Sequence, residues 1–309
     1  MRLGLKVVCL MAVATCGVET PWAQDLSPHA YIITPIHSNA IILTNSFYSG
    51  SYDLAGVAPI TNASGTYDVP VATLYHSFNF FGRSANATIS LPYGVGNFKG
   101  EVVGVQQQVY RSGLVDLTSR ISVNFRGGPA MPVQQFVKWK QKTILGLSLK
   151  TVAPTGQYDP TKLVNWGANR WAFKPEFGYS GRWNKWVLDG YAGAWFFTTN
   201  PQFYSPKGPE PQTENHIGAL EAHLSYDLKP RLWFSLDGNF WVGGRTSLNG
   251  VANPSTRQEN SRIGATASVP VSKHQSVKVS YNDGDYTQYG ESYRSVSVAW
   301  QYSWLGRPK

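Results

Sequence analysis

The chain has 309 residues, with 27 Lys and Arg against 18 Asp and Glu, and charged residues make up only 15% of it. Soluble globular domains usually carry about 25% charged residues, whereas apolar residues here reach 42% and aromatic residues 14%. This composition excludes a disordered chain. Beyond the N-terminus no apolar run approaches the ~18 residues of a membrane-spanning helix, which excludes a helical membrane protein but not a membrane β-barrel.

The N-terminus has the features of an export signal. A short positive region precedes an apolar run over 7–18, and Ala23 is a small residue suited to a cleavage site. We therefore expect a signal peptide over 1–23, which contains both cysteines, Cys9 and Cys16. Lipid modification of Cys16 is the alternative, although the residue before it is unsuited to that reaction. The mature chain is expected to be exported, without disulfides or a Cys-ligated metal.

Most of the remaining chain alternates apolar and polar residues with a period of two. Over 231–241, for example, Phe234 and Leu236 alternate with Ser235 and Asp237. Segments of about ten residues with one apolar and one polar face indicate β-strands. The other segments with this pattern are 84–91, 114–125, 143–153, 170–180, 186–198, 217–227, 262–271, 276–282 and 295–304.

The links between these segments alternate between short and long. Short links lie at 81–83, 181–185, 229–230 and 272–275, and long links at about 50–69, 93–113, 155–169, 199–214 and 243–261. Short periplasmic turns and longer outer loops are typical of a transmembrane up-and-down barrel. Aromatic residues such as Trp186, Tyr226 and Trp304 near segment ends fit an interfacial girdle. A soluble β-sandwich, the alternative, would require neither feature.

The number of strands follows from parity. A chain that starts and ends in the periplasm crosses the membrane an even number of times, so we place the alternating segment 100–110 in the second outer loop, where it could fold into the lumen. The prediction is an all-β protein with one closed antiparallel barrel of about twelve strands over 39–304, with fourteen as the alternative. A periplasmic segment over 24–38 precedes it and a tail over 305–309 follows it. Such a ring encloses a narrow or partly plugged pore.

The side chains that this alternation places inside the barrel are balanced in charge. Six acids and six bases predict no strong field of one sign, whereas an anion pore would show Arg and Lys without matching acids. Most are expected to pair across strands, and inner aromatic rings could either stack on planar solutes or fill space. The candidates for lining the lumen or contacting solute are Tyr191, Trp195, Trp233, Trp241, Lys150, Lys174, Glu176, Glu221, His223, Asp237 and Arg262.

Motifs for catalysis and metal binding are absent from the sequence. There is no Gly-x-Ser-x-Gly, no His-Glu-x-x-His and no phosphate-binding glycine loop. The adjacent His76 and Ser77 would point to opposite faces of a strand, so they could not form a nucleophile–base pair. We therefore expect no enzyme activity, no cofactor and no metal.

The surplus of positive charge lies near the short turns. It is expected to attract anionic lipid headgroups, a better explanation than nucleic acid binding for an exported barrel. A short interfacial helix could form within 132–140. The expected partners are outer-membrane lipids and lipopolysaccharide, the barrel assembly machinery and a small hydrophobic solute, and the oligomeric state is open.

The stretch over 153–178 resembles the signature of a known family. It contains Ala153-Pro-Thr-Gly-Gln-Tyr-Asp-Pro160, and shorter stretches at 38–41, 81–86, 112–116, 191–197 and 298–302 are similar as well. The family comprises outer-membrane transporters of the meta-pathway of phenol degradation. The resemblance implies a β-barrel in the outer membrane of a Gram-negative bacterium and uptake of aromatic or other hydrophobic compounds, without a defined set of functional residues. The tail after the last aromatic strand departs from the usual chain end.

The loop over 155–169 is a candidate lid. Its base re-enters the barrel with charged residues, so the loop could fold over the mouth of the pore. The lid candidates are Tyr158, Asp159, Asn165, Asn169 and Arg170. The sequence thus predicts a channel for passive uptake of small apolar or aromatic compounds. The alternative is a plugged barrel with a structural or surface-interaction role and no transport.

Overall fold

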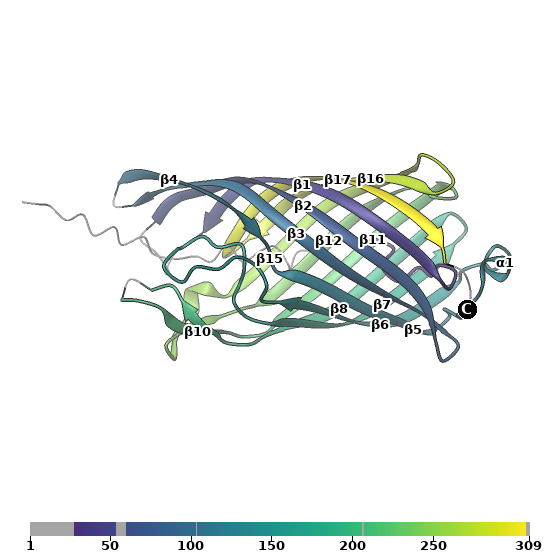
Figure 1. Ribbon diagram of the computed structural model, residues 1–309, viewed down its shortest axis with the longest axis horizontal. Helices are drawn as coiled ribbons and strands as arrows, with labels where there is room; N and C mark the ends of the chain where they lie inside the picture. The colour runs from purple at the N-terminus through teal and green to yellow at the C-terminus, as the bar shows by residue number, and fades with distance from the viewer. Residues whose placement is uncertain (1–27, 54–59, 103, 206, 307–309) are drawn as a thin grey trace, which may run out of the picture.

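The computed structural model describes residues 28–53, 60–102, 104–205 and 207–306. The expected signal peptide over 1–23 lies outside the described residues, as do 24–27 of the expected N-terminal segment and 307–309 of the tail. Figure 1 shows a long barrel of steeply tilted strands. No described helix is long and apolar enough to cross a membrane.

Twelve antiparallel strands close into a ring, as predicted, and a thirteenth strand pairs outside it. Successive ring members pair with each other, and the last pairs with the first. The ring consists of β1 (Ser38–Asp53), β2 (Ile60–Phe80), β3 (Arg83–Val102), β5 (Leu117–Arg126), β6 (Thr143–Ala153), β7 (Ala172–Trp183), β8 (Trp186–Phe197), β11 (Ile217–Lys229), β12 (Leu232–Gly243), β15 (Gln258–Pro270), β16 (Gln275–Thr287) and β17 (Gly290–Leu305).

The period-two pattern sorts the side chains between the two faces of this wall. On β12, Leu236 is 65% exposed, whereas the neighbouring Asp237 is 5% exposed and faces inwards. The same outward apolar face includes Leu43, Leu74, Ile89, Ile121, Leu149, Phe177, Leu188, Leu220, Ile263, Val279 and Val298. A closed wall that makes its own backbone hydrogen bonds and carries an apolar outer face is what lipid requires. The protein is therefore a transmembrane β-barrel of the outer-membrane type.

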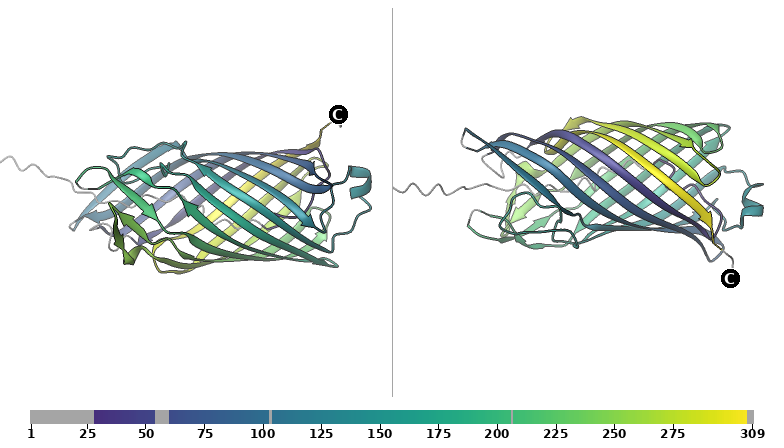
Figure 2. Two further views of the ribbon diagram at one scale, coloured as in Figure 1. Left: turned by 90° about the horizontal axis from the view of Figure 1, so that it is seen from below. Right: turned by 45° about the horizontal axis from the view of Figure 1, so that its top comes forward.

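The two ends of the barrel differ as the link lengths predicted. The short turns lie at one end, together with the end of β17 and the short helix α1 (Val133–Phe136), which falls within the expected segment 132–140. Figure 2 shows α1 beyond this end in two further views. Short turns face the periplasm in such barrels, so we call this the periplasmic end and the opposite one the outer end.

The prediction of outer loops at 50–69 and 93–113 is wrong, because much of both segments is strand. β2 and β3 stay paired out to Ile60 opposite Val102, and β4 (Val105–Leu114) pairs with the distal half of β3 instead of folding into the lumen. Figure 1 shows β4 at the outer end. These extensions need no lipid-facing side chains, so their sequence carries only a weak alternating pattern.

The outer connections between β8 and β11 and between β12 and β15 form a second, smaller sheet. It consists of four short strands, β9 (Asn200–Phe203), β10 (Glu210–Glu214), β13 (Thr246–Leu248) and β14 (Val251–Asn253). A short 3-10 helix, η2 (Pro254–Thr256), follows β14. The loop between β6 and β7, which contains the expected lid, has no helix or strand.

Candidate functional site

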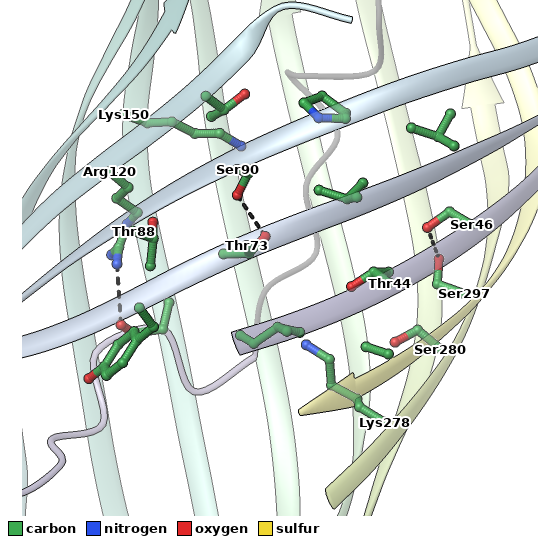
Figure 3. Close-up of a pocket in the computed structure, with 18 of the residues that line it drawn as sticks. Thr44, Ser46, Thr73, Thr88, Ser90, Arg120, Lys150, Lys278, Ser280 and Ser297 are labelled. Carbon is green, nitrogen blue, oxygen red and sulfur yellow. Dashed lines mark hydrogen bonds between the residues drawn. The ribbon is translucent and has the colours of Figure 1, made fainter. Parts of the chain in front are cut away.

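A cavity of about 620 Å³ lies inside the barrel. One side of its wall comes from β1, β2, β3, β16 and β17, which contribute mostly short apolar and hydroxyl side chains, together with the larger Tyr48, Tyr75 and Tyr293. They include Ala40, Ile42, Thr44, Ser46, Val69, Val71, Thr73, Ser90, Ser280 and Ser297. Figure 3 shows Thr44, Thr73 and Ser90 pointing into this space. Because most of these side chains are small, they leave the space of the cavity along this side.

The opposite side of the lumen is filled by large side chains. Trp195 and Trp241 are each 1% exposed and belong to one buried cluster with residues of β6, β7 and β11. Trp233 packs against His29, with ring centroids 4.3 Å apart. All three tryptophans lie inside the ring, but none is among the residues that line the cavity. On this side of the lumen the three tryptophans fill space and do not line the cavity.

The charged candidates divide between the cavity and the layer behind it. Lys174 Nζ lies 2.7 Å from carboxylate oxygens of both Glu176 and Glu221, and these three residues line the cavity. Behind them, His223 Nδ1 and Asp237 Oδ1 are 2.9 Å apart and both side chains are buried. Of the eleven lumen candidates, the structure brings six to the cavity: Tyr191, Lys150, Lys174, Glu176, Glu221 and Arg262.

The charged side chains that the sequence placed inside the barrel divide unevenly between the cavity and its surroundings. Five cations and two carboxylates line the cavity. The cations are Arg120, Lys150, Lys174, Arg262 and Lys278, and the carboxylates are Glu176 and Glu221. Other inner acids are bound elsewhere: Asp189 accepts a hydrogen bond from the His29 amide at 3.0 Å, and Asp237 contacts His223. Counting inward charges in the sequence could not show this division.

Residues 28–37 enter the barrel at its periplasmic end, a position that the sequence did not predict. The Tyr31 side chain is fully buried, and a Cβ placed on Gly146 or Gly178 would overlap its ring. Tyr31 Oη lies 2.9 Å from both Ser148 Oγ and Glu176 Oε1. The two glycines thus form a recess in the wall that holds the N-terminal segment.

Further contacts fix this segment below the cavity. The Ala30 amide donates to Tyr191 Oη at 3.1 Å, and Thr34 Oγ1 lies 2.8 Å from Tyr75 Oη. Ile33 packs with Met131 and Ile144, beside the connection that carries α1. Four residues of the segment line the cavity: His29, Ala30, Ile32 and Thr34. The N-terminal segment therefore forms the periplasmic boundary of the cavity.

The outer boundary includes one residue of the loop between β6 and β7. Trp166 lines the cavity, is 3% exposed, and packs with Tyr67 and Phe98 of the wall. A Cβ on Gly94 would overlap its indole ring. Asp116 holds the loop in place by accepting hydrogen bonds from the amides of two loop residues, at 2.7 and 2.8 Å.

The five lid candidates hold this loop from outside the cavity. Tyr158 Oη donates to the Gln202 carbonyl at 2.9 Å, and Arg170 forms an ion pair with Glu214. Asn169 bonds to Asn200, and Asn165 bonds to the backbone around Asp159. The Lys162 ammonium beside Asp159 holds the pKa of that carboxyl well below its usual range. The sequence-based list omitted Trp166, although it is the one large aromatic residue between Tyr158 and Arg170.

His76 and Ser77 lie on opposite faces of β2. The His76 ring faces outwards, with Nδ1 2.8 Å from Asn39 Oδ1, whereas Ser77 is 1% exposed and donates to the Pro35 carbonyl at 2.6 Å. They cannot act as a nucleophile and its base. Among the residues that the structure describes, no three His, Cys, Asp or Glu side chains are grouped to hold a metal ion.

The comparisons with known proteins agree with this architecture. The family described as "Putative MetA-pathway of phenol degradation" matches residues 42–306. The COG4313 outer membrane channel from Pseudomonas putida F1 is 17% identical, with 91% of this chain and 100% of that chain covered and a TM-score of 0.73. The transport unit of the autotransporter AIDA-I from Escherichia coli is 11% identical, with 93% and 95% covered and a TM-score of 0.53. At these identities the two structures support the fold alone. No curated protein sequence matches the chain at a level that indicates a relative.

We expect Gly178→Val to displace the N-terminal segment, because the new side chain would occupy the space of the Tyr31 ring. Overpacking costs about 1–3 kcal/mol, so the segment should open roughly tenfold more often or more. In mature protein that carries Ala30→Cys as its reporter, a thiol reagent added to the refolded barrel would then label Cys faster.

Gly190→Val provides the matched control. Gly190 lies on the neighbouring strand β8, and a Cβ there would meet nothing within 4 Å. It should leave the labelling rate unchanged. Equal rates in the two variants would contradict the role of the glycine recess.

Proposed function

Since the chain belongs to the family described as "Putative MetA-pathway of phenol degradation", we propose that it is an outer-membrane channel for passive uptake of small hydrophobic or aromatic compounds. The observation that carries the proposal is the cavity of about 620 Å³ inside a membrane-spanning ring. That volume falls within the ~300–1,000 Å³ of ordinary small-molecule sites. Its wall of Ala, Ile, Val, Thr and Ser residues suits a compact apolar body with a polar edge.

In this proposal the two boundaries of the cavity act as gates. A solute reaches the cavity past Trp166 and leaves towards the periplasm when the segment over 28–37 moves. Neither element is a strand of the twelve-stranded ring, so both can shift without breaking the pairing that lipid requires. Passage is passive, and the concentration difference across the membrane drives it.

We propose transport and not catalysis. Within the described strands the adjacent His76 and Ser77 point to opposite faces, and Lys174 is bound between two carboxylates. The channel would contact outer-membrane lipids and lipopolysaccharide through its apolar outer face, and the barrel assembly machinery would insert it.

The alternative is a plugged barrel with a structural or surface-interaction role. The buried position of Tyr31 favours it, since the N-terminal segment lies inside the barrel and forms the periplasmic boundary of the cavity. The two proposals differ in whether the cavity conducts solute, and the next experiment separates them.

Filling the cavity should stop uptake. Thr44 points into the cavity from β1, whereas its neighbour Asn45 is exposed on the outer face. Cells that produce the protein should take up radiolabelled toluene faster than cells with an empty vector. Thr44→Trp should return the initial rate to the empty-vector level, and Asn45→Trp should keep the rate of the parent protein. Equal uptake with and without the protein would support the plugged barrel instead.

Removing the indole at the outer boundary should ease access to the cavity. Trp166→Ala deletes a ring that is 3% exposed and packs on Tyr67 and Phe98, and we expect a higher single-channel conductance in planar bilayers. Trp171→Ala removes an indole that is 44% exposed at the start of β7 and serves as the matched control. If Trp166→Ala and Trp171→Ala conducted like the parent protein, the loop would have no part in access.

A further inference from the structure

We propose that two hydrogen-bonded pairs of hydroxyl groups in the cavity wall recognise one neutral oxygen group on the solute, either a hydroxyl or a carbonyl. The pairs are Ser46 with Ser297 and Thr73 with Ser90. This inference rests on the proposed function, and it names the polar group that a compact apolar solute carries. Since the pairs bind the oxygen and not the ring, the ring can be alicyclic as well as aromatic.

Each pair joins two neighbouring strands and faces the cavity. Ser46 on β1 lies directly opposite Ser297 on β17, and their Oγ atoms are 2.7 Å apart. Thr73 on β2 lies directly opposite Ser90 on β3, and Thr73 Oγ1 is 2.8 Å from Ser90 Oγ. All four residues line the cavity, and Figure 3 shows both pairs there. A solute inside the cavity therefore meets them directly.

Both pairs can donate a hydrogen bond to a solute or accept one from it. A hydroxyl group carries one hydrogen and two lone pairs, so the bond within a pair uses only one of its two hydrogens. Either hydroxyl of a pair can supply that hydrogen. Among the described residues, neither pair has a further side-chain hydrogen bond that would fix this direction. The remaining hydrogen can therefore bind a carbonyl oxygen, and the remaining lone pairs can accept from an alcohol.

Apolar side chains adjoin both pairs on a neighbouring strand. Val69 lies directly opposite Ser46, and Ile42 lies directly opposite Thr73. Both apolar residues line the cavity as well. Side chains directly opposite each other in an antiparallel sheet have Cβ atoms about 4.5–5.5 Å apart. The wall thus places an apolar contact beside each polar one, at a separation that suits the apolar body and the oxygen of one small molecule.

Hydrogen bonds between neutral groups suit a site through which solute passes. They are roughly half as strong as hydrogen bonds to a charged group, and a conducting site has to release what it binds. Hydroxyl pairs on opposite strands also stabilise a sheet without any ligand. Recognition of a solute predicts an effect that depends on the oxygen of the solute, whereas a role in joining strands alone does not.

Binding of three probes of similar size to the refolded full mature protein tests this inference. Cyclohexanol, cyclohexanone and methylcyclohexane share a six-membered ring and differ in carrying a hydroxyl, a carbonyl or a methyl group. Isothermal titration calorimetry would measure the affinity of each probe for the parent protein and for its variants. The proteins are compared for one probe at a time, because the three probes partition differently into detergent.

The variant that combines Ser46→Ala, Ser297→Ala, Thr73→Val and Ser90→Ala lacks both pairs. It should raise the Kd of cyclohexanol and cyclohexanone about fivefold, the effect of one lost hydrogen bond, without raising that of methylcyclohexane. Thr66→Val removes a hydroxyl from an exposed position of β2 outside the cavity lining, and it should change no affinity. Heat-modifiable migration on gels would confirm that each barrel is folded. If the combined variant does not fold, two variants that each lack one pair replace it, and at least one of them should weaken binding of both oxygenated probes.

The outcomes separate this inference from the proposed function. An equal change for all three probes, or no change, would overturn the recognition of oxygen and leave the pairs as contacts between strands. A rise in Kd for only one oxygenated probe would overturn their double role as donor and acceptor. In either case uptake of toluene, which carries no oxygen, would still support the channel. Absence of all probe binding together with absence of toluene uptake would overturn both.

Discussion

A backbone that crosses a lipid bilayer has to satisfy its own hydrogen bonds, and the rest of this structure depends on how the ring does so. The ring closes where β1 pairs with β17 along their full length, from Ser38 opposite Leu305 to Asp53 opposite Gly290. Since the wall needs no partner inside the lumen, its inner face is free to vary around the circumference. Large side chains fill one side of the lumen and short ones leave the cavity on the other.

Glycines in the wall position both boundaries of that cavity. Tyr31 of the N-terminal segment rests against Gly146 and Gly178, and Trp166 of the loop rests against Gly94. At each boundary an aromatic side chain packs against a glycine of the wall, and that side chain comes from a segment that is not a strand of the ring. Such contacts are well packed and non-covalent, which is what a passive channel needs from parts that close it and still move.

The fold was predictable where lipid imposes a pattern, and less so elsewhere. The alternation around Leu236 and the alternating link lengths identified the closed ring of twelve strands. The strand extensions that end in β4 lie beyond the lipid and lack that pattern. The position of Tyr31 was not readable, because it depends on glycines more than 100 residues away; its partner Ser148 is 117 residues distant. For the same reason the sequence identified inward charges but not how they divide between the cavity and the layer behind it.

If the protein is a channel of this kind, solute is held inside this cavity during passage. A crystal structure of the protein grown with 4-iodobenzoate would test it most directly, because anomalous scattering locates the iodine without ambiguity. We expect iodine inside the cavity, against the wall formed by Ala40 and Val71. Iodine found only on the outer face or among the outer loops, with the cavity unoccupied, would contradict it.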